Sequence, residues 1–191
     1  MLALVAALAL AVGGVAWELV RFGPSATSAA WNLEAEVRAR LTASASHLRE
    51  SAARVASQTA LIEAASRDRD RVPELFAALP AAPDTALTVY VPAGAGALRV
   101  LAWNDGPAED IPEPRAQADV PTIFVAQGTL GLRLVAWHPI VVDRRRLAVV
   151  TAELILSTTA GIHPSLGEYH FPTSFGPVLV TRAGTEPRAT D

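Results

Sequence analysis

The first seventeen residues of the chain carry no charged side chain, and this apolar stretch constrains the fold more than any other feature. A membrane-spanning helix needs about 20 mostly apolar residues, because each residue adds ~1.5 Å and the hydrocarbon core is ~30 Å thick. Residues 1–21 reach that length, with Glu18 near their end and Trp17 where an interfacial aromatic side chain would lie. We therefore predict a transmembrane anchor over residues 1–21.

Two other interpretations of this segment stay open. A buried core helix would carry its apolar side chains on one face, whereas this segment is apolar all round. A cleaved signal peptide would have basic residues ahead of the apolar run, which are absent here, and small residues at a cleavage site, for which residues 26–30 offer a weak match. Arg21 and the other nearby arginines all follow the segment, so the positive-inside rule alone favours a cytoplasmic placement of the remainder.

Length and composition narrow the class of protein. After the anchor, the 191-residue chain has room for one ordinary domain. The net charge of -3 gives no electrostatic reason to expect binding to nucleic acid. The absence of cysteine excludes disulfides and thiolate metal sites.

A long helix is predicted over residues 31–66, after a linker rich in Gly, Pro and Ser over residues 22–30. Apolar or small side chains recur in it with alternating steps of four and three, which is a weak heptad seam formed by Leu41, Ala45, Leu48, Ala52, Val55, Thr59 and Ile62. Such a helix would be ~50 Å long. It could project from a membrane as a stalk, pair with a second copy of itself, or pack on its own sheet.

The remainder of the chain reads as a short helix followed by strands. The helix covers residues 72–79, with Pro73 in its first turn. Strands are predicted over residues 86–91, 98–103, 131–142, 147–156 and 177–181, with a loop over 104–120 and irregular structure over 157–173. This order predicts an α+β fold, with an N-terminal transmembrane helix, a long helix and an antiparallel sheet of four to five strands.

A short sequence echo suggests a candidate ligand site. LRVLAW at residues 98–103 resembles LRLVAW at residues 132–137. Alternate residues of a strand share a face, so two arginines and two tryptophans would line one side of the sheet. A guanidinium binds a carboxylate bidentately and an indole provides an apolar wall, which would suit a small organic acid or an amino acid. The candidate ligand-binding residues are Tyr90, Arg99, Trp103, Arg133 and Trp137. The alternative is that the tryptophans are core residues and the arginines extend to water.

The sequence offers no catalytic constellation. It contains no nucleophile elbow, phosphate loop or metalloprotease motif, so we expect no catalytic residue and no cofactor. His163, Glu168 and His170 could hold a metal, but their spacing matches no standard zinc site, and we expect none there.

Three segments together resemble a known family. They are VASQTALIEAASRDRDRVPELFAAL (55–79), TVYVPAGAGALRVLAW (88–103) and AWHPIVVDRRRLAVVTAEL (136–154). Behind an apolar N-terminal segment, this pattern resembles the extracytoplasmic Cache or PAS-like sensor domains of bacterial membrane receptors. The resemblance covers about residues 31–156 and rests on hydrophobic patterns. The family's usual glycine early in the last apolar strand is absent, since Leu147 and Ala148 stand there.

The resemblance implies a domain layout and a function. Residues 67–160 would form the PAS-like sensor domain, and residues 161–191 a C-terminal extension or the start of the next module. The sensor domain would lie outside the cytoplasm, in the periplasm, held at the inner membrane by the anchor. We also expect a homodimer that pairs through the long helix. A ligand would shift that helix and pass the signal to a cytoplasmic output such as the histidine kinase of a two-component system.

Two other functions are weighed against this one. The chain could be a single-span membrane-anchored structural or assembly protein that dimerises through its long helix and docks a protein partner. A secreted enzyme is the third possibility, and the sequence offers it no catalytic residues.

Overall fold

The computed structural model describes residues 25–81, 84–94, 96–106, 111, 118–128, 131–156, 168–173 and 176–181. The helices are α2 (Ala26–Ala56), α3 (Thr59–Arg67), the 3-10 helix η1 (Arg69–Arg71) and α4 (Val72–Ala78). The strands are β1 (Ala86–Gly94), β2 (Ala97–Trp103), β3 (Thr122–Gly128), β4 (Gly131–Val142), β5 (Arg145–Ile155), β6 (Glu168–Thr173) and β7 (Gly176–Thr181). Residues 25–42 belong to one compact unit, and the remainder of α2, the helices α3 and α4 and the main sheet belong to another.

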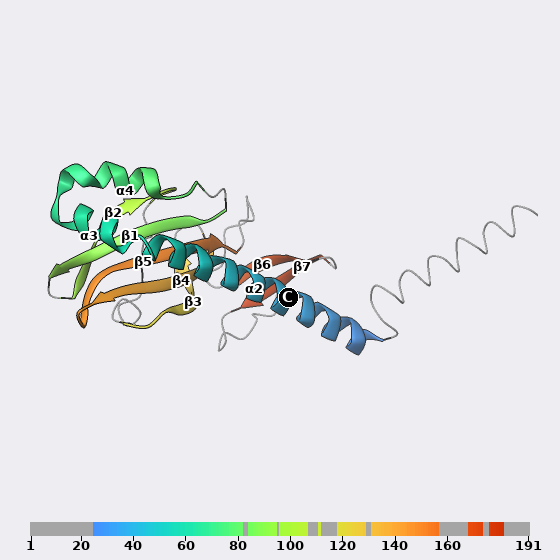
Figure 1. Ribbon diagram of the computed structural model, residues 1–191. Coiled ribbons are helices and arrows are strands. Elements are labelled where there is room, and N and C mark those ends of the chain that lie inside the picture. Colours follow the sequence, from blue (N-terminus) through green and yellow to red (C-terminus); the bar gives the residue numbers. More distant parts are fainter. Residues whose placement is uncertain are drawn as a thin grey trace, which may run out of the picture. The chain divides into compact units, whose positions relative to one another are not determined.

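The main sheet has five antiparallel strands in the order β2-β1-β5-β4-β3, and β6 and β7 form a separate two-stranded sheet (Figure 1). The predicted α+β class with an antiparallel sheet is thereby confirmed. Two strands were not expected. β3 follows the loop predicted over residues 104–120, and β6 lies in the stretch predicted to be irregular. β3 lacks a strict apolar alternation and pairs with β4 from Thr122 to Gly128, whereas β6 pairs with β7.

The prediction of one helix over residues 31–66 is wrong at its start and in its middle. The helix begins at Ala26, inside the predicted linker, because Ser25 and Ser28 each accept a hydrogen bond from the other's backbone N–H, at 3.2 and 3.0 Å. This reciprocal arrangement is a capping box. The helix ends at Ala56, and α3 begins at Thr59.

Side-chain hydroxyls explain the break between α2 and α3. Ser57 Oγ donates to the carbonyl oxygen of Arg54 at 2.7 Å, and Thr59 Oγ1 donates to that of Ala56 at 2.9 Å. Such bonds give the last carbonyl groups of α2 a partner other than the next turn of helix. The chain can therefore turn and lay α3 against the sheet without leaving these acceptors unsatisfied.

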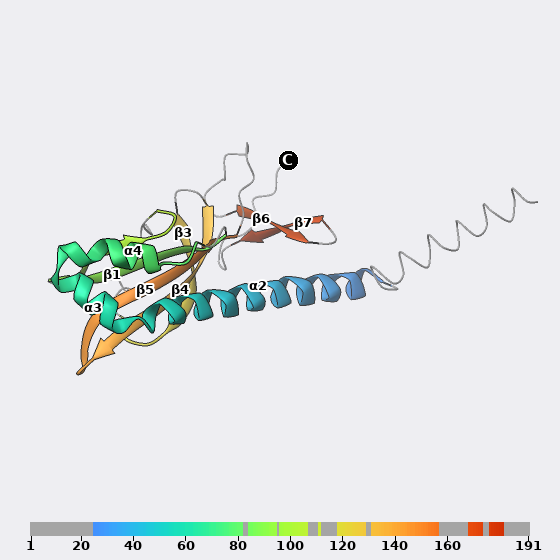
Figure 2. The ribbon, with the colours of Figure 1, turned by 45° about the horizontal axis from the view of Figure 1, so that its top comes forward.

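The predicted heptad seam is partly buried, and the buried part packs on the chain's own sheet. Leu48, Ala52 and Val55 of α2 and Ile62 of α3 are fully buried in a core that they share with strands β1, β2, β4 and β5. Figure 2 shows α3, α4 and the end of α2 beside the sheet. Burial of each large apolar side chain contributes roughly 1.5–3 kcal/mol. This packing fixes one face of the sheet as the core face.

Asn104 fastens the end of β2 to the start of β1. Its Oδ1 accepts from the backbone N–H of Leu87 at 2.7 Å. Its Nδ2 donates to the carbonyl oxygens of Pro80 and Thr85, at 3.0 and 3.1 Å. One amide side chain thus satisfies three backbone groups of the segment that leads from α4 into β1.

The predicted anchor over residues 1–21 lies outside the described residues. From Ser25 onward, the described helices include none that is both long enough and apolar enough to cross a membrane.

Replacement of Asn104 by Ala should destabilise the domain by about 2–3 kcal/mol, because three backbone groups lose their partner at about 1 kcal/mol each. Urea unfolding followed by circular dichroism measures this change. Asp105→Ala is the matched control, since Asp105 is the exposed next residue. Equal stability of the two variants would contradict this role for Asn104.

Candidate functional site

The face of the sheet turned away from the helices carries a buried group of polar and aromatic side chains. Thr151 of β5 pairs directly with Thr88 of β1 and with Trp137 of β4. Directly paired residues share a face, as do residues two positions apart on a strand. Several buried residues therefore share this face. We call the polar and aromatic ones among them the polar face: Thr88, Tyr90, Arg133, Trp137, Thr151 and Glu153.

The polar face contains a buried ion pair. Arg133 Nη1 donates to Glu153 Oε2 at 2.6 Å, and the two side chains are 10% and 5% exposed. Thr151 Oγ1 donates to the other carboxylate oxygen, Glu153 Oε1, at 3.4 Å. Burial of two charges carries a large desolvation cost, which their mutual attraction and added hydrogen bonds offset. Removal of one partner is expected to cost about 3–5 kcal/mol, because the other charge is left buried alone.

Burial controls the protonation of the acids on this face. It raises the pKa of Glu153 above the ordinary carboxyl range, although Arg133 and the Thr151 hydroxyl both act in the opposite direction. It also raises the pKa of Tyr90 well above its ordinary value, and the Glu153 charge adds to this effect. Tyr90 is therefore a neutral phenol at physiological pH, hydrogen-bonded to the Thr88 and Thr151 hydroxyls.

Aromatic and aliphatic side chains surround Trp137 beside the ion pair. Trp137 is 1% exposed and packs with Tyr90 and Val149. Partly buried side chains complete this cluster: Leu98, Val100, Ile111, Ala118 and Phe124. The site thus joins a charged pair to an apolar wall, a combination typical of small-molecule sites.

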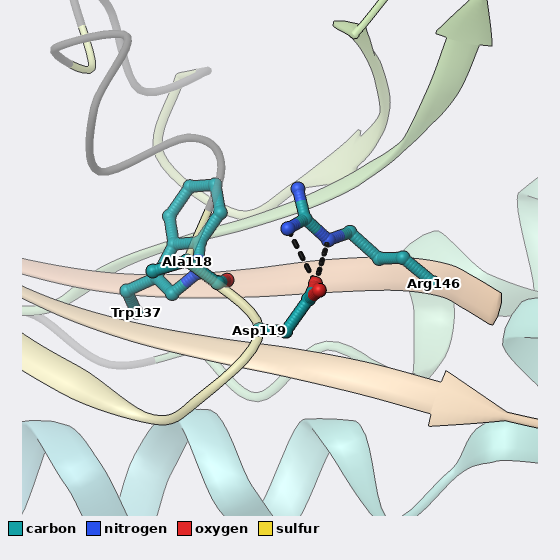
Figure 3. A network of polar contacts seen from close by, with 4 residues as sticks. All are labelled: Ala118, Asp119, Trp137 and Arg146. Atoms are coloured by element: carbon teal, nitrogen blue, oxygen red, sulfur yellow. Dashed lines mark hydrogen bonds and ion pairs between the residues drawn. The ribbon is translucent and has the colours of Figure 1, made fainter. Parts of the chain in front are cut away.

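The connection between β2 and β3 is attached to the sheet at two adjacent residues. Trp137 Nε1 donates to the carbonyl oxygen of Ala118 at 2.9 Å, and Arg146 Nε donates to Asp119 Oδ1 at 2.9 Å (Figure 3). The indole of Trp137 is therefore both part of the apolar wall and an anchor for this connection. Arg146 provides a second anchor from β5.

Of the five candidate residues, three come together and two do not. Tyr90, Arg133 and Trp137 lie on the polar face. Arg99 pairs with Val91, whose side chain belongs to the core under the helices, so Arg99 projects from the opposite face and is exposed. Trp103 pairs with Thr88 of the polar face at the sheet edge, but its ring meets the ring of Phe76 of α4 edge-on, with centroids 4.9 Å apart.

The prediction that both arginines and both tryptophans line one side is therefore wrong, and a β-bulge is the reason that Arg99 leaves that side. Val89 pairs with Ala102 while Tyr90 pairs with Val100, which leaves Leu101 as an extra residue in β2. A bulge interrupts the alternation of side chains along a strand. Leu101 and Ala102 accordingly both lie in the core under the helices.

Sequence reasoning missed Glu153, Thr151 and Thr88. A signal for two of them was present, since Thr151 and Glu153 interrupt an apolar run at residues 147–156 with a spacing of two. Polar residues at this spacing in a strand share a face. Their meaning depends on Arg133, which lies twenty residues earlier and meets them only through the β4–β5 pairing.

The described residues contain no group of three or more His, Cys, Asp and Glu side chains placed to hold a metal ion. His163, one of the three residues considered above as a metal set, lies outside the described residues.

Replacement of Glu153 by Gln should flatten the pH dependence of stability. The folded state holds the Glu153 proton more tightly than the unfolded chain, because its folded pKa is raised. The stabilisation is complete below the ordinary glutamate pKa and is lost as the pH rises through the raised folded value. The free energy of unfolding in urea, measured from about pH 4 to 7, should therefore fall less steeply in the variant. Glu63→Gln, at a half-buried helix position whose carboxylate pairs with Arg67, should keep the original slope.

Replacement of Trp137 by Phe should cost about 1 kcal/mol for the bond to Ala118, plus a packing loss, and should loosen the β2–β3 connection. Amide hydrogen exchange around Ala118 and Asp119 should accelerate. Trp103→Phe is the matched control, because Trp103 lies at the sheet edge and is 38% exposed. Unchanged exchange in Trp137→Phe would show that Arg146 suffices as an anchor.

Comparisons of the chain with protein-family models, with curated proteins and with solved structures each found no match. The chemistry of the polar face therefore carries the functional interpretation.

Proposed function

We propose that the chain is the extracytoplasmic ligand-sensing input domain of a membrane-bound signal-transduction receptor, of the histidine kinase type. The polar face is the observation that carries the proposal. It places a buried ion pair beside aromatic side chains, on the sheet face opposite the helices. Buried ion pairs are seldom more stabilising than apolar side chains of similar volume. A charged pair in this position is better explained by recognition than by stability.

The architecture supports the same proposal. Helices on one face of a five-stranded antiparallel sheet are consistent with the PAS-like domain that residues 31–156 resemble. The helix α2 has 31 residues and is ~45 Å long. Its last turns are buried in the core through Leu48, Ala52 and Val55. A ligand that repacks the sheet would therefore displace α2, and through it a membrane anchor over residues 1–21.

The second candidate is a membrane-anchored structural or assembly protein that dimerises through α2. Trp31, which is 73% exposed near the start of this helix, is the observation that favours it. The later seam residues Leu48, Ala52 and Val55 are already packed in the chain's own core. Dimerisation through α2 would therefore use its earlier turns. This candidate gives the polar face no role.

A ligand screen separates the two candidates. A compound among small organic acids, amino acids and purines should raise the melting temperature of the full chain. A ligand present at 100 times its Kd stabilises by about 2.7 kcal/mol, which amounts to several degrees. Arg133→Ala and Trp137→Ala should each abolish the rise, measured from the variant's own melting temperature.

Arg99→Ala is the control for this screen, because Arg99 lies on the opposite face and should leave the rise intact. A screen in which no compound shifts the melting temperature would count against the sensor and favour the assembly protein.

A further inference from the structure

The two edges of the main sheet differ in how they are protected from pairing with other strands. We infer that the edge strand β3 is a pairing surface for a second copy of this chain. Two sheets would join through antiparallel hydrogen bonds between the two β3 strands, about a two-fold axis at Val125. This interface is separate from the ligand binding proposed above.

One hydrogen bond fixes the direction of the backbone groups along β4. The N–H of Leu156 donates to the carbonyl oxygen of Leu132 at 2.9 Å, so Leu132 turns its backbone groups toward β5. Successive residues of a strand turn these groups toward opposite neighbours. The ladder between β4 and β5 has no register shift from Arg133 to Ile140. The backbone groups that β4 turns toward β3 are therefore those of Arg133, Val135 and Trp137.

The same alternation identifies the outward-facing residues of β3. The residues that bond to β4 are the ladder partners of those three: Thr122, Phe124 and Ala126. The alternate residues, Ile123, Val125 and Gln127, therefore turn their N–H and C=O groups away from β4. Within the described part of the chain, β3 pairs with no strand other than β4, and it lies at the margin of the sheet opposite β2 (Figure 1). Val125 is 52% exposed there.

β3 lacks the features that protect a sheet edge from pairing. Its sequence TIFVAQG contains no charged residue and no proline, and its ladder with β4 has no bulge. Natural edge strands carry such features because unpaired N–H and C=O groups are a template for another strand. The opposite edge strand, β2, has them, since Arg99 is exposed and the pairing with β1 shifts twice. The main sheet is thus protected at β2 and open at β3.

The open edge is complementary to a second copy of itself. Val125 is the middle residue of β3, and the outward-facing residues Ile123 and Gln127 lie two positions on either side of it. About a two-fold axis at Val125, Ile123 of each copy would face Gln127 of the other, and every outward N–H and C=O group would gain a partner. No like charges would face each other, because β3 has none. The product would be a sheet of ten strands whose outer edges are both β2.

A disulfide between two copies tests this interface directly, because the chain contains no cysteine. Opposed residues of a hydrogen-bonded antiparallel pair have Cα atoms about 5.5 Å apart, which is within the disulfide range. Val125→Cys in the full chain should therefore form a disulfide-linked dimer under mild oxidation, at least about tenfold faster than its controls. The controls are Val120→Cys and Val141→Cys, since both valines are exposed and lie outside β3. Non-reducing electrophoresis measures the rate.

A charge on the axis should dissociate the dimer. Val125→Lys places two like charges opposite each other, and sedimentation velocity should give a dimer dissociation constant at least about tenfold above that of the unaltered full chain. Val120→Lys adds the same charge outside β3 and should leave the constant unchanged, as should Trp31→Ala on α2. Circular dichroism checks that each variant keeps its sheet.

Equal crosslinking rates at Val125 and Val120 would overturn this interface, as would equal dissociation constants for Val125→Lys and the unaltered chain. A dimer that Trp31→Ala dissociates and Val125→Lys does not would place the contact on α2 instead. A chain that stays monomeric at the highest concentration would also refute β3 pairing between copies, and would leave this edge to a strand of another protein. None of these outcomes decides the ligand screen, so the sensor proposal is tested separately.

Discussion

The packing of α2, α3 and α4 on one face of the main sheet is the constraint on which the rest of the structure depends. It buries Leu48, Val55, Ile62 and Leu75 completely and makes that face the apolar core. Once the helices cover one face, the strands pack apolar residues against them. The other face combines the polar side chains of β1, β4 and β5 with the apolar cluster around Trp137.

The polar face carries costs that a purely structural surface would avoid. The Arg133–Glu153 pair loses hydration on burial, and the pKa of Glu153 is raised although a guanidinium lies beside it. Perturbed groups of this kind occur both at functional sites and in structural ion pairs, and they are one observation behind the proposed ligand site. The indole of Trp137 lies on the same face as the ion pair, and its Nε1 donates a hydrogen bond to the carbonyl oxygen of Ala118.

The bulge in β2 changes which side chains lie on each face of the sheet. With strict alternation, Arg99 and Trp103 would share the face of Arg133 and Trp137. The extra residue, Leu101, is instead absorbed into the core, and Arg99 is left exposed on the helix side. Among the described residues, the polar face thereby contains Arg133 but not Arg99, which is a consequence of strand pairing.

The sequence by itself determined the local elements and the class of the fold. Apolar periodicity indicated the buried stripe of α2 and α3, Pro73 marked the start of α4, and alternation marked four strands of the main sheet. It also identified Tyr90, Arg133 and Trp137 as candidates, because charged and aromatic residues at even spacing on strands share a face.

The helix break at Ser57 has a local cause, since the Ser57 and Thr59 hydroxyls donate to carbonyl oxygens three residues earlier. Tertiary structure alone decided the bulge at Leu101 and the partnership of Arg133 with Glu153. Strand register and contacts across a hairpin depend on which residues meet in space. Spacing along a single strand or helix carries no information about the partner strand's register.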